Sequence, residues 1–229
     1  MKEKISIVSA YYKQEEMTKE FLDNLQEKCV DYDIEMILVN GASEPIEHSF
    51  ITKRVDLEEN VGFSYNMNQG LKEATGQFIV IMGNDGFPTT PNWLEELLVV
   101  QEHTMAGIVS PQIDNPDFTH HKMHVVEEEP DMKLSYVKFY PAVCWLLTRA
   151  SFNAIGFFDE RFGIGTYEDN DYILRCLRKG LPVVVSHRYI FNHRCSQTFS
   201  MFDANKIMSD NRIIFNNKWA NIGDDEDDE

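Results

Sequence analysis

The stretch that most constrains the fold of this chain is residues 77–88, QFIVIMGNDGFP. Residues 78–83 carry no charge and are mostly β-branched or bulky, which is typical of a strand buried on both faces of a sheet. The run ends in Asn84, Asp85 and Gly86. Open α/β sheets bind ligands at the carboxyl ends of their parallel strands, where glycines let a ligand approach the backbone. The stretch therefore predicts either a ligand site built around Asp85 or an ordinary polar turn.

Strands and helices alternate around this stretch. Apolar strands are predicted at residues 4–9 and 35–39, with a third short strand near Val55 and a helix of four-residue apolar periodicity after the first strand. Ser64 and Thr90 are placed to cap the helices on either side of the central strand. The alternation predicts an α/β fold with right-handed crossovers and a Rossmann-like, mostly parallel central sheet flanked by helices.

The second half continues the pattern with one interruption. Strands are predicted at residues 107–113 and 182–186, and an amphipathic helix at 203–219 closes the fold. Residues 114–133 lose periodicity and predict a long surface excursion. Its three histidines, His120, His121 and His124, are more typical of a solvated loop than of a metal site.

Polar residues gather at the start of another predicted helix. Glu168, Asp169 and Asp171 fall in its first turn. Acids near a helix amino terminus are favoured by the macrodipole, so stabilisation of the helix is one explanation. Three acids in four positions exceed what capping requires, so one can point into the adjoining cleft. His193 follows the last predicted strand, where a histidine is more often structural than a metal ligand.

The aromatic stretch 136–148 suits one or two strands and contains Trp145 near its end. A tryptophan in such a stretch is either a core residue or a platform on which a sugar ring stacks. Both interpretations of Trp145 stay open at the level of sequence.

Composition and charge narrow the possible partners and location. The 229 residues carry a formal net charge of −17, which disfavours sequence-independent binding to nucleic acid or to anionic bilayers. The four cysteines show neither CxxC pairing nor zinc spacing, which is typical of reduced thiols in a cytosolic protein. No apolar run reaches the roughly 18 residues of a spanning helix. We expect a cytoplasmic protein without a membrane span and a disordered acidic tail at residues 221–229.

Six segments of the chain combine into a known pattern. In order they are ISIVSAYYKQ, ILVNGAS, NVGFSYNMNQGLKEATG, IVIMGNDGFPTTPNWL, GFFDERFGIGTYEDNDYILRCLRKG and NHRCSQTF. Together they resemble the family 2 glycosyltransferases of the GT-A fold, including the rhamnosyltransferase-like branch. The resemblance covers most of the chain. It implies one GT-A-type domain over residues 1–220, with a nucleotide-sugar and metal half at 1–113 and an acceptor and base half at 114–220.

The resemblance implies a nucleotide-sugar donor (a UDP-, GDP- or dTDP-sugar), Mn²⁺ or Mg²⁺, and a carboxylate base. Asp85 stands at the position of the DXD-type metal motif, and His193 matches a histidine that completes the metal shell in some members. Asp169 matches the aspartate of the ED motif, the usual candidate base, with Glu168 beside it. The residues assigned to the donor are Ala10, Tyr11, Asn40, Asn68, Asn84 and Asp85.

The chain departs from the family pattern at three positions. Gly83 replaces the first acid of a full DXD motif, Asn40 replaces an acid after the second strand, and Met67 stands where many members carry a basic residue. These departures bear on metal affinity and donor identity. A motif with one acid still serves if diphosphate oxygens and water complete the shell, because Mg²⁺ and Mn²⁺ prefer about six oxygen-type ligands with few from the protein.

The chemistry of the residues favours an inverting glycosyltransferase over a non-catalytic binding module and over a nucleotidyltransferase. A base opposite the leaving diphosphate implies transfer with inversion at the anomeric carbon. A degenerate module that binds nucleotide or glycan without catalysis is favoured by Gly83 and Asn40 and disfavoured by the retained run EDND. A nucleotidyltransferase would carry a basic glycine-rich segment after the first strand, which AYYKQEE lacks.

The acceptor is expected to be a hydroxyl of a glycan, a protein or another molecule. Its predicted contacts are Trp145, Tyr167 and Asp171. A nucleic-acid acceptor is the least favoured because the chain is strongly acidic.

Overall fold

The computed structural model describes residues 3–114, 125–194 and 201–220. Its strands are, in chain order, β1 (Lys4–Tyr11), β2 (Asp33–Gly41), β3 (Lys53–Leu57), β4 (Phe78–Met82), β5 (Gly86–Pro88), β6 (Ile108–Asp114), β7 (Val125–Glu129), β8 (Leu134–Val137), β9 (Cys144–Thr148) and β10 (Val183–His193). Its helices are α1 (Glu15–Lys28), α2 (Phe63–Glu73), α3 (Trp93–Thr104), α4 (Arg149–Ile155), the 3₁₀ turn η2 (Glu160–Phe162), α5 (Glu168–Arg178) and α6 (Ala204–Trp219).

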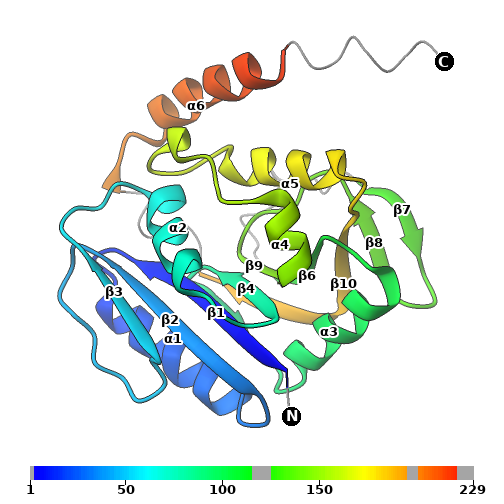
Figure 1. Ribbon diagram of the computed structural model, residues 1–229, viewed down its shortest axis with the longest axis horizontal. Helices are drawn as coiled ribbons and strands as arrows, with labels where there is room; N and C mark the ends of the chain where they lie inside the picture. Colours follow the sequence, from blue (N-terminus) through cyan, green and yellow to red (C-terminus); the bar gives the residue numbers. More distant parts are fainter. Residues whose placement is uncertain (1–2, 115–124, 195–200, 221–229) are drawn as a thin grey trace.

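The described strands form one mixed sheet in the order β3-β2-β1-β4-β9-β6-β10-β8-β7, with β5 pairing to β10 (Figure 1). Strands β3, β2, β1 and β4 are parallel neighbours, and β6 and β10 are parallel to each other. The antiparallel strand β9 lies between β4 and β6 and so keeps those two strands in the same direction. The predicted α/β fold with a mostly parallel sheet is confirmed.

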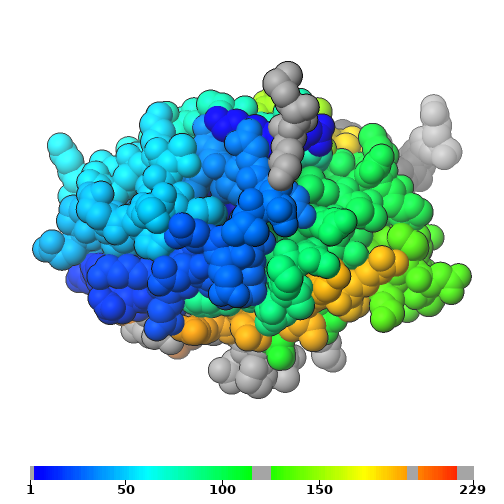
Figure 2. Space-filling model, turned by 90° about the horizontal axis from the view of Figure 1, so that it is seen from below, coloured from blue at the N-terminus to red at the C-terminus, as the bar shows by residue number. Residues whose placement is uncertain are grey.

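Helices cover both faces of the sheet, and each face has its own core. On one face, α1 and α3 bury residues such as Phe21 and Trp93 against the sheet. On the other face, α2, α4 and α5 bury residues such as Leu71, Phe152 and Tyr172 (Figure 1). Figure 2, which shows the molecule from below, has segments coloured blue to cyan on one side and segments coloured green to orange on the other.

Several element ends differ from the sequence-based predictions. The residue that precedes α2 is Gly62, so Ser64 lies inside the first turn and does not cap it. Likewise, Asn92 precedes α3, two residues later than the predicted cap Thr90. Strand β10 continues well beyond residue 186 because a register shift between Ser186 and Ile190 lets it pair further along β6.

The surface excursion was predicted at residues 114–133, of which the structure describes 114 and 125–133. Its second part forms β7, which pairs with β8 in antiparallel fashion at the edge of the sheet. The predictions for His120, His121 and His124, and for the tail 221–229, lie outside the described residues.

The structure bears on two features considered from composition, the cysteines and membrane-spanning helices. Cys29, Cys144 and Cys176 are buried free thiols, as predicted, and Cys195 lies outside the described residues. In the part of the chain that the structure describes, no helix is long and apolar enough to cross a bilayer.

Candidate active site

The carboxyl ends of the parallel strands place the predicted site residues along one edge of the sheet. Strand β1 ends at Tyr11, β2 at Gly41, and β10 at His193. Asp85 follows β4 at the same edge, after the turn at Gly83. The shared direction of these strands is therefore what brings together residues that are far apart in the sequence.

Asp85 and His193, the two predicted metal ligands, are in contact. His193 Nε2 lies 3.1 Å from Asp85 Oδ2, and their side chains are 10% and 20% exposed. The backbone fixes this pairing, because β5 pairs with β10 so that His193 lies opposite Gly86, and the Arg194 amide donates to the Asp85 carbonyl oxygen at 2.9 Å.

The glycine at position 83 leaves room for the Asp85 carboxylate. A Cβ atom at residue 83 would lie 2.6 Å from Asp85 Oδ1, which is closer than a carbon atom tolerates without movement. The absence of a side chain at Gly83 thus leaves the space that the Asp85 carboxylate occupies.

The Asn84 side chain makes its hydrogen bond within the protein. Its Nδ2 donates to the hydroxyl of Thr18 in α1 at 2.9 Å, and the residue is buried. The predicted contact of the Asn84 side chain with the donor does not fit this position, because the amide is used to join the turn to α1.

The donor-side residues of β1 and β2 also make contacts within the protein. The Tyr11 hydroxyl donates to the Glu44 carbonyl oxygen at 2.8 Å, and burial raises the pKa of Tyr11 to about 12. Asn40 accepts from the Ser43 amide through Oδ1 at 2.8 Å and donates through Nδ2 to Asp56 Oδ1 at 3.0 Å. Ala10 is partly buried beside them. Tyr11 and Asn40 therefore shape this end of the site rather than offer free polar groups to it.

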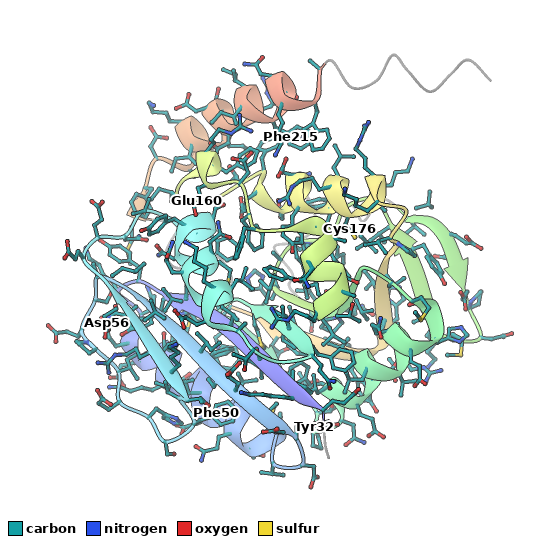
Figure 3. All side chains as sticks on the ribbon, viewed as in Figure 1. Tyr32, Phe50, Asp56, Glu160, Cys176 and Phe215 are labelled. Carbon is teal, nitrogen blue, oxygen red and sulfur yellow. The ribbon has the colours of Figure 1, made fainter. Side chains whose placement is uncertain are left out.

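Asp56 is an acid at this edge that sequence reasoning missed (Figure 3). It pairs in register with Asn40 across the parallel strands β2 and β3, and its side chain is 47% exposed. Burial tends to raise the pKa of the Asp56 carboxyl, but hydrogen bonds from Arg54 and Asn40 outweigh it and hold the pKa below its usual value. Asp56 could have been identified from the sequence, because Asn40 and Asp56 both stand near the ends of predicted adjacent strands.

Asn68 joins α2 to the segment before η2. Its Nδ2 donates to the Phe158 carbonyl oxygen at 3.0 Å and to Glu160 Oε1 at 2.9 Å, and its Oδ1 accepts from the Phe158 amide at 2.9 Å. Glu160 lies beside α2 (Figure 3). Because the Asn68 amide is buried and fully engaged, a contact with a diphosphate would require these bonds to open.

The acids Glu168 and Asp169 begin α5 directly after a loop that reaches the same edge of the sheet. The Phe63 amide at the start of α2 lies 3.4 Å from the Ile164 carbonyl oxygen, and a Cβ atom at Gly62 would lie 2.1 Å from the Gly163 carbonyl oxygen. This close packing places the loop that leads to the acid pair against the chain that follows β3.

Burial dominates the electrostatics of this acid pair. Glu168 is 9% exposed, and its Oε2 has no hydrogen-bond partner among the described residues. Burial, followed by the charge of Asp169, raises the pKa of Glu168. Burial likewise raises the pKa of Asp169, although its Oδ1 accepts from the Asn170 amide at 2.8 Å. Raised carboxyl pKa values in a cleft are typical of groups that take up or release protons near neutral pH.

The three predicted acceptor residues lie in different surroundings. Trp145 is fully buried, with its ring 6.4 Å from Phe158 and 5.7 Å from Tyr172 between centroids, so it is a core residue rather than a stacking platform. Asp171 is also fully buried and receives bonds from α5 and α6, which leaves no oxygen for an acceptor. Tyr167 alone is partly exposed.

Comparison with known proteins bears on what this site does. The family profile described as Glycosyl transferase family 2 matches residues 6–158. Among curated proteins, the O-antigen biosynthesis protein RfbC of Myxococcus xanthus is 24% identical over 210 residues, covering 79% of this chain. The chain spans only 16% of the length of that relative.

Solved structures share the fold. The mannosyltransferase PcManGT of Pyrobaculum calidifontis, in complex with GDP-Man and Mn²⁺, superposes with a TM-score of 0.68 at 17% identity over 86% of this chain and 59% of that chain. GalNAc-T7 with UDP, GalNAc and Mn²⁺ gives 0.69 at 13% identity, over 84% and 44%.

TarS of S. aureus (residues 1–349, with UDP-GlcNAc) gives 0.64 at 14% identity, over 87% and 61% of the two chains. These identities are low, so the structural likeness shows the GT-A glycosyltransferase fold, and the profile match, which covers more than half of the chain, shows the family. The chain belongs to glycosyl transferase family 2.

Proposed function

We propose that the chain is an inverting glycosyltransferase that moves a sugar from a nucleotide-diphosphate sugar to an acceptor hydroxyl. The observation that carries the proposal is the Asp85–His193 pair, with 3.1 Å between its polar atoms, on the same edge of the sheet as the buried Glu168 and the half-buried Asp169. The donor class is supported by the GDP- and UDP-linked ligands of structural neighbours. The rhamnosyltransferase-like branch and the two-part division of the domain remain predictions.

The Asp85–His193 pair fits a divalent ion such as Mn²⁺ or Mg²⁺. Carboxylate and imidazole are ligands that Mn²⁺ accepts, and two neighbours were solved with Mn²⁺. The described residues hold no group of three or more His, Cys, Asp or Glu side chains placed around one ion, so donor oxygens and water would complete the shell. A bound ion supplies Lewis-acid stabilisation of the leaving diphosphate.

Asp169 is the proposed general base. The acceptor hydroxyl attacks the anomeric carbon, a new carbon–oxygen bond forms, and the bond from that carbon to the diphosphate oxygen breaks. The hydroxyl proton passes to the Asp169 carboxylate, and the nucleotide diphosphate leaves with the bonding electrons. The raised pKa of Asp169 suits it to accept this proton, and Glu168, the other predicted catalytic acid, lies beside it in the first turn of α5.

Two variants test the two halves of this mechanism. Calorimetry with UDP, GDP and dTDP, with and without Mn²⁺, identifies the nucleotide, and assays of matching nucleotide sugars then measure turnover. Asp85→Ala is expected to weaken metal-dependent nucleotide binding at least tenfold, because it removes the only acid of the proposed ion site. Asp169→Asn is expected to leave nucleotide binding unchanged and to lower turnover by about 10²–10⁴-fold.

The same measurements distinguish the proposed function from a degenerate binding module and test the roles of the individual residues. Nucleotide binding without any sugar hydrolysis or transfer would favour the degenerate binding module, which the single acid of the metal motif also fits. Full turnover in Asp169→Asn would remove it as the base. An unchanged metal titration in His193→Ala would remove that histidine from the ion site.

The acceptor and the location stay proposals as well. We infer a hydroxyl of a glycan, a protein or another molecule, approaching the loop that carries Tyr167, with a nucleic-acid acceptor disfavoured by the net charge of −17. A cytoplasmic location is supported by the buried reduced thiols.

A further inference from the structure

Helix α6 lies across the loop that leads into the acid pair (Figure 1). Its Asn211 is buried, and the Nδ2 atom lies 2.8 Å from the Phe162 carbonyl oxygen, 2.6 Å from that of Gly165 and 3.1 Å from that of Thr166. A side-chain amide carries two N–H donors, so these acceptors share them. A single side chain therefore fixes the path of loop 162–166.

The loop needs such support because its backbone is strained. Thr166 and Tyr167 are consecutive non-glycine residues with φ of +73° and +67°, and they immediately precede Glu168. A left-handed conformation is rare for a β-branched residue and persists only where the surroundings hold it. The conformation that delivers Glu168 and Asp169 to the site is thus not one that the loop would adopt on its own.

The rest of α6 holds the first turn of α5. The Phe215 ring lies 5.5 Å from that of Tyr167 between centroids, on the side of α6 that faces the molecule (Figure 3). Lys218 Nζ lies 2.6 Å from Asp171 Oδ1, and the Trp219 indole donates to the same oxygen at 3.1 Å. The loop before Asp169 and the helical turn that contains it are consequently both attached to α6.

We propose that Asn211 is a positioning residue of the transferase: by holding loop 162–167 in its strained conformation, it sets the orientation of Asp169 toward the acceptor hydroxyl. The inference rests on the proposed function, in which Asp169 is the base. Asn211 acts only through the loop and is not assigned any contact with donor, ion or acceptor.

The test compares Asn211→Ala with Asn217→Ala, an identical change at an exposed position of the same helix. We expect the backbone amides of residues 163–169 to exchange hydrogen at least tenfold faster in Asn211→Ala. Turnover of the nucleotide sugar is expected to fall at least tenfold, while the dissociation constant of the nucleotide diphosphate with Mn²⁺ changes less than twofold. Asn217→Ala should match the wild type in all three measurements.

A second variant keeps the test sharp if Asn211→Ala fails to fold. Asn211→Ser retains one donor on a shorter arm, so its exchange rates and turnover should lie between those of Asn211→Ala and the wild type. A shift in the acid limb of the pH–rate profile would further support positioning, because a loss of folded protein scales turnover equally at every pH.

The outcomes separate this inference from the proposed function. Unchanged exchange at residues 163–169, or an equal loss of turnover and of nucleotide affinity, would overturn the role of Asn211. If exchange responds as expected but the wild type transfers no sugar, the proposed function fails while the ordering of the loop by Asn211 stands.

Discussion

The carboxyl group of Glu168 lies in the first turn of α5, where the residue is buried and Oε2 has no hydrogen-bond partner among the described residues. A helix amino terminus favours a negative charge, but this gain is small next to the cost of taking a carboxylate out of water. The net result is a raised pKa, caused first by burial and then by the charge of Asp169. The folded protein therefore prefers Glu168 in its protonated form.

This preference predicts a pH-dependent stability. Because the pKa of Glu168 is higher in the folded than in the unfolded chain, the folded state holds more protons between the two values, and stability is lost as pH rises through that window. Glu168→Gln removes the titrating group. We expect this variant to match the wild type in unfolding free energy near pH 5 and to exceed it by about 2 kcal/mol near pH 9, measured by urea denaturation.

Glu102→Gln provides the control, since it makes the same change at an exposed position of α3. Its stability difference from the wild type should stay within about 0.5 kcal/mol across the same pH range. A Glu168→Gln variant whose difference from the wild type did not grow with pH would show that Glu168 is not buried as a protonated acid.

At the scale of elements, the junction between α2 and the segment before η2 depends on Asn68. This residue satisfies both the amide and the carbonyl of Phe158 and also binds Glu160. Buried backbone groups that lose their partners cost about 1–3 kcal/mol each. The junction matters for the site because the loop leading to Glu168 begins directly after it.

Asn68→Ala is therefore expected to lower the unfolding free energy by about 2–4 kcal/mol, because Phe158 loses two hydrogen bonds in a buried position. Nucleotide affinity should change less than twofold in the folded variant. Denaturant titration and calorimetry measure the two quantities.

Gln69→Ala, at the adjacent half-buried position, should cost less than about 1 kcal/mol. If Asn68→Ala instead weakened nucleotide binding tenfold with little change in stability, the contact with the diphosphate implied by the family resemblance would be correct and the structural role of Asn68 would be secondary.

Element types could be predicted from sequence more completely than element ends. Apolar periodicity identifies the central strand and the helices, because burial determines it directly. The start of α2 could not be placed, since it depends on Gly62, whose φ of +118° and close approach to Gly163 are set by tertiary packing. The far part of β10 was missed because its polar residues alternate outside the core after a register shift at Ser186.

At the scale of the whole molecule, the sequence predicts which strand ends meet at the candidate site better than it predicts which side chains are buried there. The proximity of Asp85 and His193 was predictable, because the family resemblance orders their segments and parallel strands share one edge. The inward positions of Asn84 and Trp145 were not, since strand patterning does not say which polar or aromatic side chain finds a buried partner. The role of Asn211 depends on contacts with a loop more than forty residues earlier in the chain.

The net charge of −17 affects any test of metal binding on the whole molecule. Divalent cations accumulate around such a surface without a specific site, so Mn²⁺ alone stabilises the folded protein by screening its charges as well as by binding.

We predict that a nucleotide diphosphate with Mn²⁺, at about 100 times its dissociation constant, raises the Tm by about 5–10 °C beyond the value in Mn²⁺ alone. Asp85→Ala should keep the screening effect of Mn²⁺ and lose about half or more of the increment from the nucleotide, with NaCl of equal ionic strength as the reference. An increment equally large in Asp85→Ala would place the nucleotide away from the Asp85–His193 pair.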